Sequence, residues 1–303
     1  MSTETINKST ELNENKKFPK ISIITPTLNQ GKYLEQTILS VLAQDYPNLE
    51  YIIIDGGSTD NSLEIIKKYE TKLHFWVSEP DNGLYDALQK GFDKSTGEIM
   101  GWLNSDDLYH PNALNMVGHL FQYFPEIKWL TGAPTIYDEL GRVTKVDSPL
   151  RWSKYMYYNS PKWSIQQEST FWHRDLWEKS GAKLNTNLRY AGDYDLFLRF
   201  FRHEKLYSIS TLIGGFRERA TQQLTLEGLA DYYAESKSVL SAAKKHFSIK
   251  DQLFSKLVFF DKLLVIVPSL RRLYFWSKID QTLFHFPRRI TFNRIKQQFE
   301  INN

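Results

Sequence analysis

Residues 20–29 read Lys20-Ile-Ser-Ile-Ile-Thr-Pro-Thr-Leu-Asn29, a short β-branched run that ends in a proline and an asparagine. Such a run predicts a buried strand, and the residues after Thr25 predict the loop that follows it. Directly beyond this loop, residues 31–44 carry apolar side chains at the spacing of one helical face. A strand that passes through a polar loop into a helix is the first half of a β–α–β unit.

The same alternation of strand and helix continues towards the middle of the chain. Strands are predicted at residues 51–55, 73–78 and 98–103, and helices follow each of them, the last at residues 112–124. Strands that alternate with helices at this spacing pair in parallel through right-handed crossovers. The fold class is therefore predicted as α/β, with a mainly parallel, Rossmann-like sheet flanked by helices.

The regular alternation of strand and helix ends in the second half of the chain. Residues 129–137 and 142–146 predict two strands joined by a hairpin turn, residues 192–201 predict a helix, and residues 206–214 predict a late strand. From residue 226 onward the chain predicts helices, the last of which are basic and aromatic.

Composition and charge exclude several classes of protein. The chain has 303 residues, no cysteine and a formal net charge of +3. The lack of cysteine excludes a disulfide scaffold, a thiolate metal site and a cysteine nucleophile, and the small net charge argues against nucleic acid as a partner. The charge is uneven, because from Lys244 onward twelve lysines and arginines face four acidic residues, which leaves +8 there and −5 in the rest. The polar residues 1–18 are expected to form a disordered leader.

Three common site motifs are absent from the sequence. There is no glycine-rich loop before the helix at residues 31–44, which argues against dehydrogenases and P-loop enzymes. There is no Gly-x-Ser-x-Gly motif of serine hydrolases and no histidine pair at helical metal-ligand spacing.

The longest apolar run, residues 257–268, is interrupted by Asp261 and Lys262. Since about 20 apolar residues are needed to span a bilayer, no transmembrane helix is expected.

Polar and acidic side chains follow three of the predicted strands. They are residues 25–29, Asp55 with the following Gly-Gly-Ser, and Asn104-Ser-Asp-Asp107. In open α/β sheets ligands bind outside the carboxyl ends of the strands, so these clusters predict a binding site. Asp106 and Asp107 are adjacent carboxylates that repel each other, and a divalent ion that carries phosphates would relieve this repulsion. The alternative is that they mark a helix start, where aspartate is common.

Three separate stretches, in their order and spacing, resemble the inverting nucleotide-sugar glycosyltransferases of glycosyltransferase family 2. They are residues 20–29, 52–60 and 97–107. The resemblance covers about residues 19–225 and implies the GT-A fold. In that fold a nucleotide-binding half, residues 19–124, merges with an acceptor-binding half, residues 125–225. Residues 226–303 would then be a basic, aromatic, helical appendage.

The resemblance implies a nucleotide site at the strand ends. Asp55 would contact the base or the ribose, and Gly56 stands where many relatives carry a second acid. Asp107 would ligate Mn²⁺ or Mg²⁺ directly, and Asp106 would bind the ribose or reach the metal through water. The other implied nucleotide contacts are Thr25, Pro26, Thr27, Asn29, Asp81 and Arg217, the last of these to phosphate oxygens.

Three of these assignments have alternatives. Asp81 lies in Pro-Asp-Asn-Gly, where it is equally a turn residue. Some relatives place a histidine metal ligand close to the position of Arg219, so the metal here has fewer protein ligands or a cation replaces part of its role. Residues 166–168, Gln-Gln-Glu, line the acceptor side or belong to a polar surface.

The stretch Gly192-Asp-Tyr-Asp195 is similar to the acidic helix start at which the family carries its catalytic base. Asp193 matches that position. A carboxylate there would take the proton of the acceptor hydroxyl, which is otherwise a poor nucleophile near neutral pH. Inversion then needs a single in-line displacement, with a metal that balances charge on the leaving diphosphate. The alternative is that Asp193 only caps the helix.

The resemblance thus implies transfer of a sugar from a UDP-, GDP- or dTDP-sugar to a glycan or lipid-linked acceptor in cell-surface polysaccharide synthesis. One alternative is a catalytically degenerate nucleotide-sugar-binding protein. Another is a sugar nucleotidyltransferase, which would carry arginine in the loop after the first strand, whereas residues 25–31 contain none. A cytoplasmic location is expected. The basic tail either contacts anionic lipid at the inner face of the membrane or packs on the catalytic domain.

Overall fold

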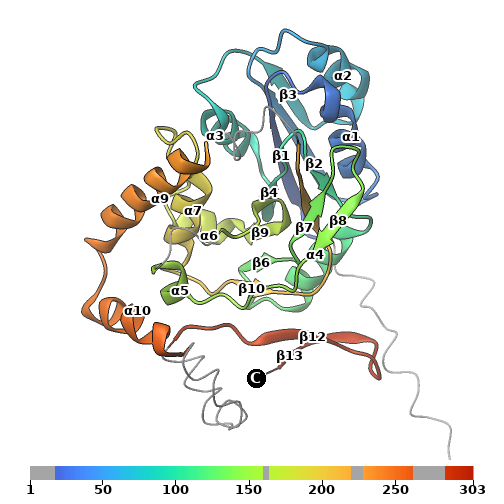
Figure 1. Cartoon of the computed structure of the whole chain (residues 1–303). Helices are drawn as coiled ribbons and strands as arrows, with labels where there is room; N and C mark the ends of the chain where they lie inside the picture. Colours follow the sequence, from blue (N-terminus) through green and yellow to red (C-terminus); the bar gives the residue numbers. More distant parts are fainter. Residues whose placement is uncertain (1–17, 160–163, 220–227, 262–283, 303) are drawn as a thin grey trace, which may run out of the picture.

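The computed structural model describes residues 18–159, 164–219, 228–261 and 284–302. Its centre is a seven-stranded sheet with the strand order β10-β6-β9-β4-β1-β2-β3 (Figure 1). The leader predicted for residues 1–18 lies, apart from Phe18, outside the described residues.

The first half of the chain builds the parallel side of this sheet, as predicted. Its elements are β1 (Ile21–Thr27), α1 (Gly31–Leu42), β2 (Leu49–Asp55), α2 (Ser62–Tyr69), a 3-10 turn (Glu70–Lys72), β3 (Phe75–Ser78), α3 (Leu84–Lys94) and β4 (Ile99–Trp102). β1 pairs in parallel with both β2 and β4, and β2 pairs in parallel with β3. Thr27, Asp55 and Ser78 are in register across β1, β2 and β3, so the loops after these strands leave the sheet at one edge.

The second half completes the sheet and adds a smaller one. Its elements are β5 (Leu108–Tyr109), α4 (Ala113–Tyr123), β6 (Trp129–Thr131), β7 (Thr135–Tyr137), β8 (Val143–Val146), α5 (Lys154–Tyr157), a 3-10 turn (Gln167–Ser169), β9 (Thr170–His173), α6 (Arg174–Lys179), α7 (Gly192–Phe200), β10 (Tyr207–Ser208) and β11 (Gly214–Arg217). β9 lies between β4 and β6 and is antiparallel to both. β5, β11, β7 and β8 form the second, four-stranded sheet.

This half differs from the sequence prediction in three strands. The strand predicted at residues 129–137 is two strands in two sheets, because Gly132-Ala-Pro134 turns the chain and a proline cannot donate to a ladder. The strand predicted at residues 206–214 is also divided, since β10 ends at Ser208 and β11 begins at Gly214. β9 was not predicted, because four residues are too few for an alternating pattern to stand out.

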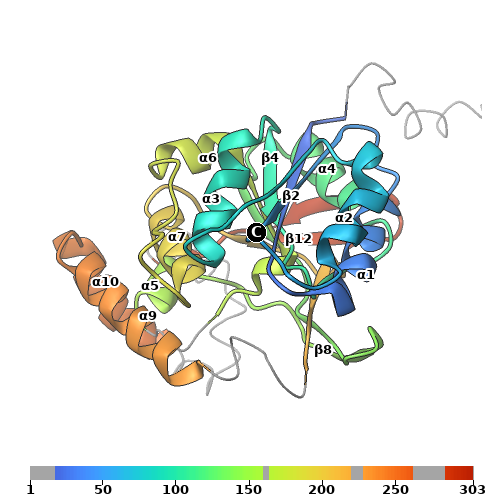
Figure 2. The ribbon, with the colours of Figure 1, turned by 90° about the horizontal axis from the view of Figure 1, so that it is seen from above.

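Helices cover both faces of the large sheet, with α1, α2 and α4 on one face and α3, α6 and α7 on the other (Figure 2). The alternation along β1 explains the two cores, because Ile21 and Ile23 belong to the first and Ile24 to the second. Gly91 lets α3 approach the sheet closely: a Cβ atom at this position would lie 2.5 Å from Cγ2 of Ile24. The two layers of helices leave the carboxyl ends of the strands free for a site.

The tail packs on the domain wherever it is described. α9 (Leu229–Lys244) lies against α7, and α10 (Ile249–Asp261) lies against α5 (Figure 1). Lys154 of α5 forms an ion pair with Asp251 of α10 at 2.7 Å, and the Ser153 hydroxyl donates a hydrogen bond to the carbonyl of Phe284. These contacts favour the packing alternative for the tail.

The end of the tail was predicted to be helical, but it forms two strands. β12 (Arg289–Asn293) and β13 (Gln298–Asn302) form an antiparallel hairpin. Its apolar residues alternate with polar ones, so Ile290 pairs with Ile301 and Phe292 with Phe299 across the two strands. In the described part of the chain, every helix is too short or too polar to cross a membrane.

Candidate active site

Two cavities adjoin at the carboxyl ends of the parallel strands. The wide cavity has a volume of about 730 Å³ and is walled by the loops after β1, β3 and β4 and by residues 186–189. The aromatic cavity has a volume of about 350 Å³ and lies beside the start of α7. Its walls include the rings of Tyr85, Trp102, Trp152, Tyr190, Phe216 and Tyr232. Leu84, Asn104 and Phe216 line both cavities, so ligands in the two would meet there.

Four residues that were predicted to bind a nucleotide line the wide cavity. They are Pro26, Thr27, Asp81 and Asp106. The Thr27 hydroxyl oxygen is buried and has no hydrogen-bond partner in the described structure. Gly56 makes room for Asp81, because a Cβ atom at Gly56 would lie 2.5 Å from Oδ2 of Asp81. A carboxylate from the loop after β3 therefore occupies the space beside Gly56.

Asp55, in contrast, does not line either cavity. Its carboxylate is fully buried and accepts hydrogen bonds from the Ser58 N–H at 3.0 Å and from the Ser78 hydroxyl at 2.6 Å. These bonds hold the loop after β2 against the end of β3. Asp55 thus shapes the loop, and its predicted contact with the base or the ribose stays a prediction.

Thr25 and Asn29 also have partners within the protein. The Thr25 hydroxyl shares a hydrogen bond of 3.1 Å with the Tyr51 hydroxyl inside the core. Asn29 Oδ1 accepts a hydrogen bond from the Thr59 N–H at 2.8 Å, which joins the loop after β1 to the loop after β2. Neither residue lines either of these two cavities, and their hydrogen bonds support the neighbouring Pro26 and Thr27; their own nucleotide contacts stay predictions.

The loop of residues 104–107, called the acidic loop below, carries two adjacent carboxylates that lie in different surroundings. Asp107 is fully buried, and its oxygens accept hydrogen bonds from the Arg217 N–H at 2.9 Å and from Asn104 Nδ2 at 3.3 Å. Burial raises the pKa of Asp107 well above its ordinary value, and the neighbouring Asp106 adds to this. Asp106 lines the wide cavity and pairs with Arg219 at 3.0 Å. Of the two carboxylates, Asp106 therefore borders the wide cavity and Asp107 is buried, and the roles predicted for the pair stay predictions.

A divalent metal would find few protein ligands here. Among the described residues no group of three or more histidine, cysteine, aspartate or glutamate side chains could hold a metal ion. Mg²⁺ and Mn²⁺ need only one or two protein carboxylates when phosphate oxygens and water complete their shell. Besides the Asp106 carboxylate, Asn104 Oδ1 is a buried oxygen without a hydrogen-bond partner in the described structure. Asp106 and Asn104 therefore fit an ion whose other ligands come from a substrate.

Arg217, predicted to contact phosphate, is a buried structural residue. Its Nε donates to the Asp106 carbonyl at 2.5 Å and its Nη1 to the Glu139 carbonyl at 2.8 Å, and the side chain is fully buried. Arg219 lines the wide cavity instead, where its Nη1 donates to Gln30 Oε1 at 3.0 Å. Arg217 ends β11 and Arg219 lies two residues further on, so the sequence pattern offered no basis for choosing between them.

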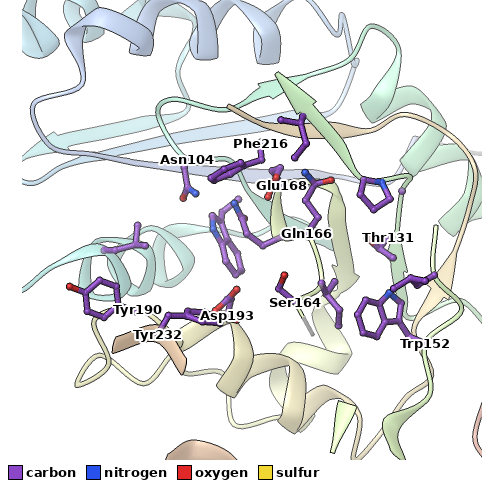
Figure 3. Close-up of a pocket in the computed structure, with 18 of the residues that line it drawn as sticks. Asn104, Thr131, Trp152, Ser164, Gln166, Glu168, Tyr190, Asp193, Phe216 and Tyr232 are labelled. Atoms are coloured by element: carbon purple, nitrogen blue, oxygen red, sulfur yellow. The ribbon is translucent and has the colours of Figure 1, made fainter. Parts of the chain in front are cut away.

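Asp193 lines the aromatic cavity from the first turn of α7, as Figure 3 shows. Its N–H donates to the Tyr85 hydroxyl at 3.4 Å, and its Oδ1 accepts from the Tyr194 N–H at 2.7 Å. Ala191 occupies the N-cap position of α7 and Asp193 lies inside the first turn, so the alternative role of Asp193 as a helix cap is not supported. Burial raises the pKa of Asp193 to about 6, which is the range expected of a general base that works near neutral pH.

Glu168 is a second buried carboxyl group in the aromatic cavity. It lies with Asn104 on one side, whereas Asp193 and Tyr232 lie on the opposite side (Figure 3). Burial raises the pKa of Glu168 to about 8, so the group is protonated near neutral pH and can donate a hydrogen bond. Its Oε1 has no partner in the described part of the chain. Residues 166–168 thus all line the cavity and do not form a polar surface.

Comparison with known families identifies the family of the chain. The family model described as Glycosyl transferase family 2 matches residues 22–187, which is more than half of the chain. The chain therefore belongs to glycosyltransferase family 2. The match ends before α7, so Asp193 and the whole of α9 lie beyond it.

Individual relatives match over part of their length. An uncharacterized glycosyltransferase of Rickettsia typhi is 28% identical over 201 residues, which cover 65% of this chain and 63% of that protein. A Bacillus subtilis glycosyltransferase, TuaG, named for teichuronic acid biosynthesis, is 35% identical over 99 residues, 32% of this chain and 39% of that protein. The chain thus covers less than two thirds of the length of these curated relatives.

Solved structures share the fold at low identity. S. aureus TarS, residues 1–349, in complex with UDP-GlcNAc has a TM-score of 0.63 and 16% identity over 77% of this chain and 68% of that one. The mannosyltransferase PcManGT of Pyrobaculum calidifontis, in complex with GDP-Man and Mn²⁺, has a TM-score of 0.52 and 17% identity over 86% of this chain and 83% of that one. These likenesses confirm the predicted GT-A fold.

Proposed function

We propose that this chain is an inverting glycosyltransferase, which moves a sugar from a nucleotide-sugar donor to a hydroxyl group of an acceptor. The observation that carries the proposal is a pair of cavities that adjoin at Asn104, with the buried carboxylate of Asp193 in the wall of the smaller one. A donor in one cavity and an acceptor in the other would react at their junction, with a base beside the acceptor.

The wide cavity is the donor site in this proposal. Pro26, Thr27 and Asp81 would contact the nucleoside, and Arg219 would contact the diphosphate, because a guanidinium group forms paired hydrogen bonds with phosphate oxygens. The donor is a UDP-, GDP- or dTDP-sugar. The likeness in fold to one protein solved with UDP-GlcNAc and to another solved with GDP-Man supports a nucleotide sugar.

A divalent ion, Mn²⁺ or Mg²⁺, is part of the proposed donor site. Asp106 and Asn104 would hold it through the carboxylate and the unpartnered amide oxygen. When bound, such an ion balances the charge that develops on a leaving diphosphate. The Mn²⁺ in the structurally similar mannosyltransferase supports this choice of cofactor.

In the transfer step Asp193 takes the proton of the acceptor hydroxyl. The oxygen of that hydroxyl forms a bond to the anomeric carbon of the donor sugar, and the bond between this carbon and the diphosphate oxygen breaks. The electron pair of the broken bond leaves with the nucleoside diphosphate, whose negative charge Arg219 partly neutralises. Because the oxygen enters opposite to the leaving group, one displacement inverts the configuration at the anomeric carbon.

The aromatic cavity is the acceptor site in this proposal. Sugar rings present apolar faces that pack on aromatic side chains such as Trp102 and Trp152. In the described chain no lysine or arginine lines this cavity, whereas Asp193 does. An anionic group on the reacting unit would therefore be repelled, so we expect a neutral sugar of a glycan or lipid-linked intermediate. The name of the relative TuaG supports a role in cell-surface polysaccharide synthesis.

We further propose that the reaction takes place in the cytoplasm at the inner face of the membrane, through basic residues of the tail. Exposed basic side chains remain on the packed tail: Lys244, Lys245, Lys250, Lys256, Arg288, Arg289, Arg294 and Lys296. Anionic lipid attracts such residues, each with about 1 kcal/mol near the surface. Co-sedimentation with vesicles that contain or lack phosphatidylglycerol tests this point, and equal binding to both would contradict it.

The proposed function is tested by calorimetry with UDP-, GDP- and dTDP-sugars, with and without Mn²⁺. We expect one nucleotide to bind, and to bind more tightly with the metal. Transfer is then measured as release of the nucleoside diphosphate that depends on a sugar acceptor. Binding without acceptor-dependent release would favour a degenerate nucleotide-sugar-binding protein, and binding of none of these donors would overturn the proposal.

A further inference from the structure

Helix α9 supplies a carboxylate to the segment directly before α7. Glu235 accepts three backbone hydrogen bonds, from the N–H groups of Arg189 at 3.0 Å, Tyr190 at 2.8 Å and Ala191 at 2.9 Å. Three consecutive N–H groups on one carboxylate fix the path of the backbone at this point, because each bond is strengthened by the charge of the acceptor. Asp193 follows only two residues later.

The segment that Glu235 holds borders both cavities. Residues 186–189 line the wide cavity, whereas Tyr190 and Asp193 line the aromatic cavity. The start of α7 has no side-chain cap of its own, since Ala191 occupies the N-cap position. The carboxylate that fixes the start of the Asp193 helix therefore comes from an element more than 40 residues further along the chain.

A second contact of α9 reaches the same place. Tyr232 lies three residues before Glu235, on the same side of the helix, and it lines the aromatic cavity opposite Glu168 (Figure 3). Gly228 just before α9 packs against Tyr190, because a Cβ atom at Gly228 would lie 2.2 Å from Cε1 of that ring. The Tyr85 hydroxyl completes the support, since it donates to the Tyr190 carbonyl at 2.7 Å.

We propose that Glu235 is a positioning residue for Asp193, and that α9 is a working part of the active site and not only an appendage. Glu235 fixes the backbone from which the Asp193 carboxylate reaches the aromatic cavity. It touches neither donor nor acceptor, since it lines neither cavity in the described structure. This inference rests on the proposed role of Asp193 as the base.

The test compares Glu235→Ala and Glu235→Gln with a matched control, Asp231→Asn, in the full-length chain. Asp231 is an exposed acid in the first turn of the same helix. We expect Glu235→Ala to lower kcat about 10- to 100-fold, the range expected when a base is displaced by a fraction of an ångström. Glu235→Gln keeps one acceptor oxygen and the same shape, so it should fold normally and show a smaller loss. The control should match the wild-type chain.

A double-mutant cycle separates positioning from simple stability. If Glu235 acts through Asp193, adding Glu235→Ala to Asp193→Asn should not lower the residual rate further, because the group being positioned is already removed. The Kd of the nucleoside diphosphate, measured by calorimetry, should change less than about threefold, since most of the donor contacts lie on other elements. The inference would be overturned if Glu235→Ala and Glu235→Gln had the same kcat per folded molecule as the control. So would fully additive losses in the cycle.

The failure of this inference is distinguishable from failure of the proposed function. A wild-type chain that neither binds a nucleotide sugar nor transfers a sugar contradicts the proposed function. A wild-type chain that transfers sugar, with Glu235 variants equally active, contradicts only the role of Glu235.

Discussion

The Asp193 carboxylate lies in a cavity walled by aromatic rings, and its burial there lowers the stability of the fold. The pKa of the group in the folded chain is raised to about 6 from 3.8. An acid with a raised folded-state pKa favours the folded state only while it is protonated, so this contribution is lost as pH rises through about 6. At neutral pH the buried charge of the proposed base therefore lowers the free energy of unfolding, as is common at functional sites.

We expect Asp193→Asn to lower kcat about 100-fold or more, to a measurable residual rate, while raising the free energy of unfolding at pH 7 by up to about 3 kcal/mol, the value of two pKa units. The amide keeps the shape of the side chain and removes the buried charge. Urea unfolding and an acceptor-dependent release assay measure the two effects. Full activity of this variant would remove Asp193 from the mechanism.

The rate should depend on pH through the same group. Below pH about 6 the Asp193 carboxylate is protonated and cannot accept the hydroxyl proton, so kcat/KM should fall about tenfold for each further unit. The profile is measured between pH 5 and pH 8, with circular dichroism at each pH to verify folding. A flat profile with an intact fold would contradict the assignment.

The two arginines after β11 should respond differently to removal. Arg219→Ala should weaken nucleoside diphosphate binding about tenfold or more and lower Tm less than Arg217→Ala does, because Arg219 lines the wide cavity. Arg217→Ala should lower the free energy of unfolding by about 3–5 kcal/mol, because it leaves buried acceptors without their charged donor. Calorimetry and thermal unfolding of both variants provide the comparison. The opposite pattern would restore Arg217 as the phosphate contact.

At the scale of the elements, the close contact of α3 with β1 depends on Gly91, which has no side chain. Gly91→Ala should lower the free energy of unfolding by about 1–3 kcal/mol, because its Cβ would lie 2.5 Å from Cγ2 of Ile24 and force one layer to shift. Lys90→Ala on the outer face of α3 is the control, since its ion pairs are partly exposed. Equal stability of the two variants would mean that the layers have room to adjust.

At the scale of the whole molecule, the tail shares the hydrophobic core of the catalytic part. Phe284 and Phe286 are buried in the same core as Tyr155 of α5, and the Phe254 ring lies 5.7 Å from the Tyr155 ring. We expect truncation after Ser248 to lower Tm by about 5 °C or more and to cause self-association, because this apolar surface becomes exposed. Thermal unfolding and light scattering measure both. A truncated chain of unchanged Tm would instead favour an independent tail.

Much of this architecture was open to prediction from local patterns. The parallel strands β1 to β4, their helices and the acidic loops follow from apolar spacing within 10–20 residues, which the amino-acid sequence records directly. The hairpin around residues 138–141 has the same local origin. Short strands such as β9 were not predicted because partners far away in the chain stabilise them. The hairpin β12–β13 was missed although its alternating pattern is local.

The sequence alone was enough for the fold class and the family resemblance, because each rests on neighbouring residues. It could not choose between Asp106 and Asp107, or between Arg217 and Arg219, since both members of each pair have the same chemistry. Burial and the packing of β11 against the acidic loop make that choice. The bonds from residues 189–191 to Glu235 likewise exist only because folding brings α9 beside α7, and no local pattern records a contact between such distant segments.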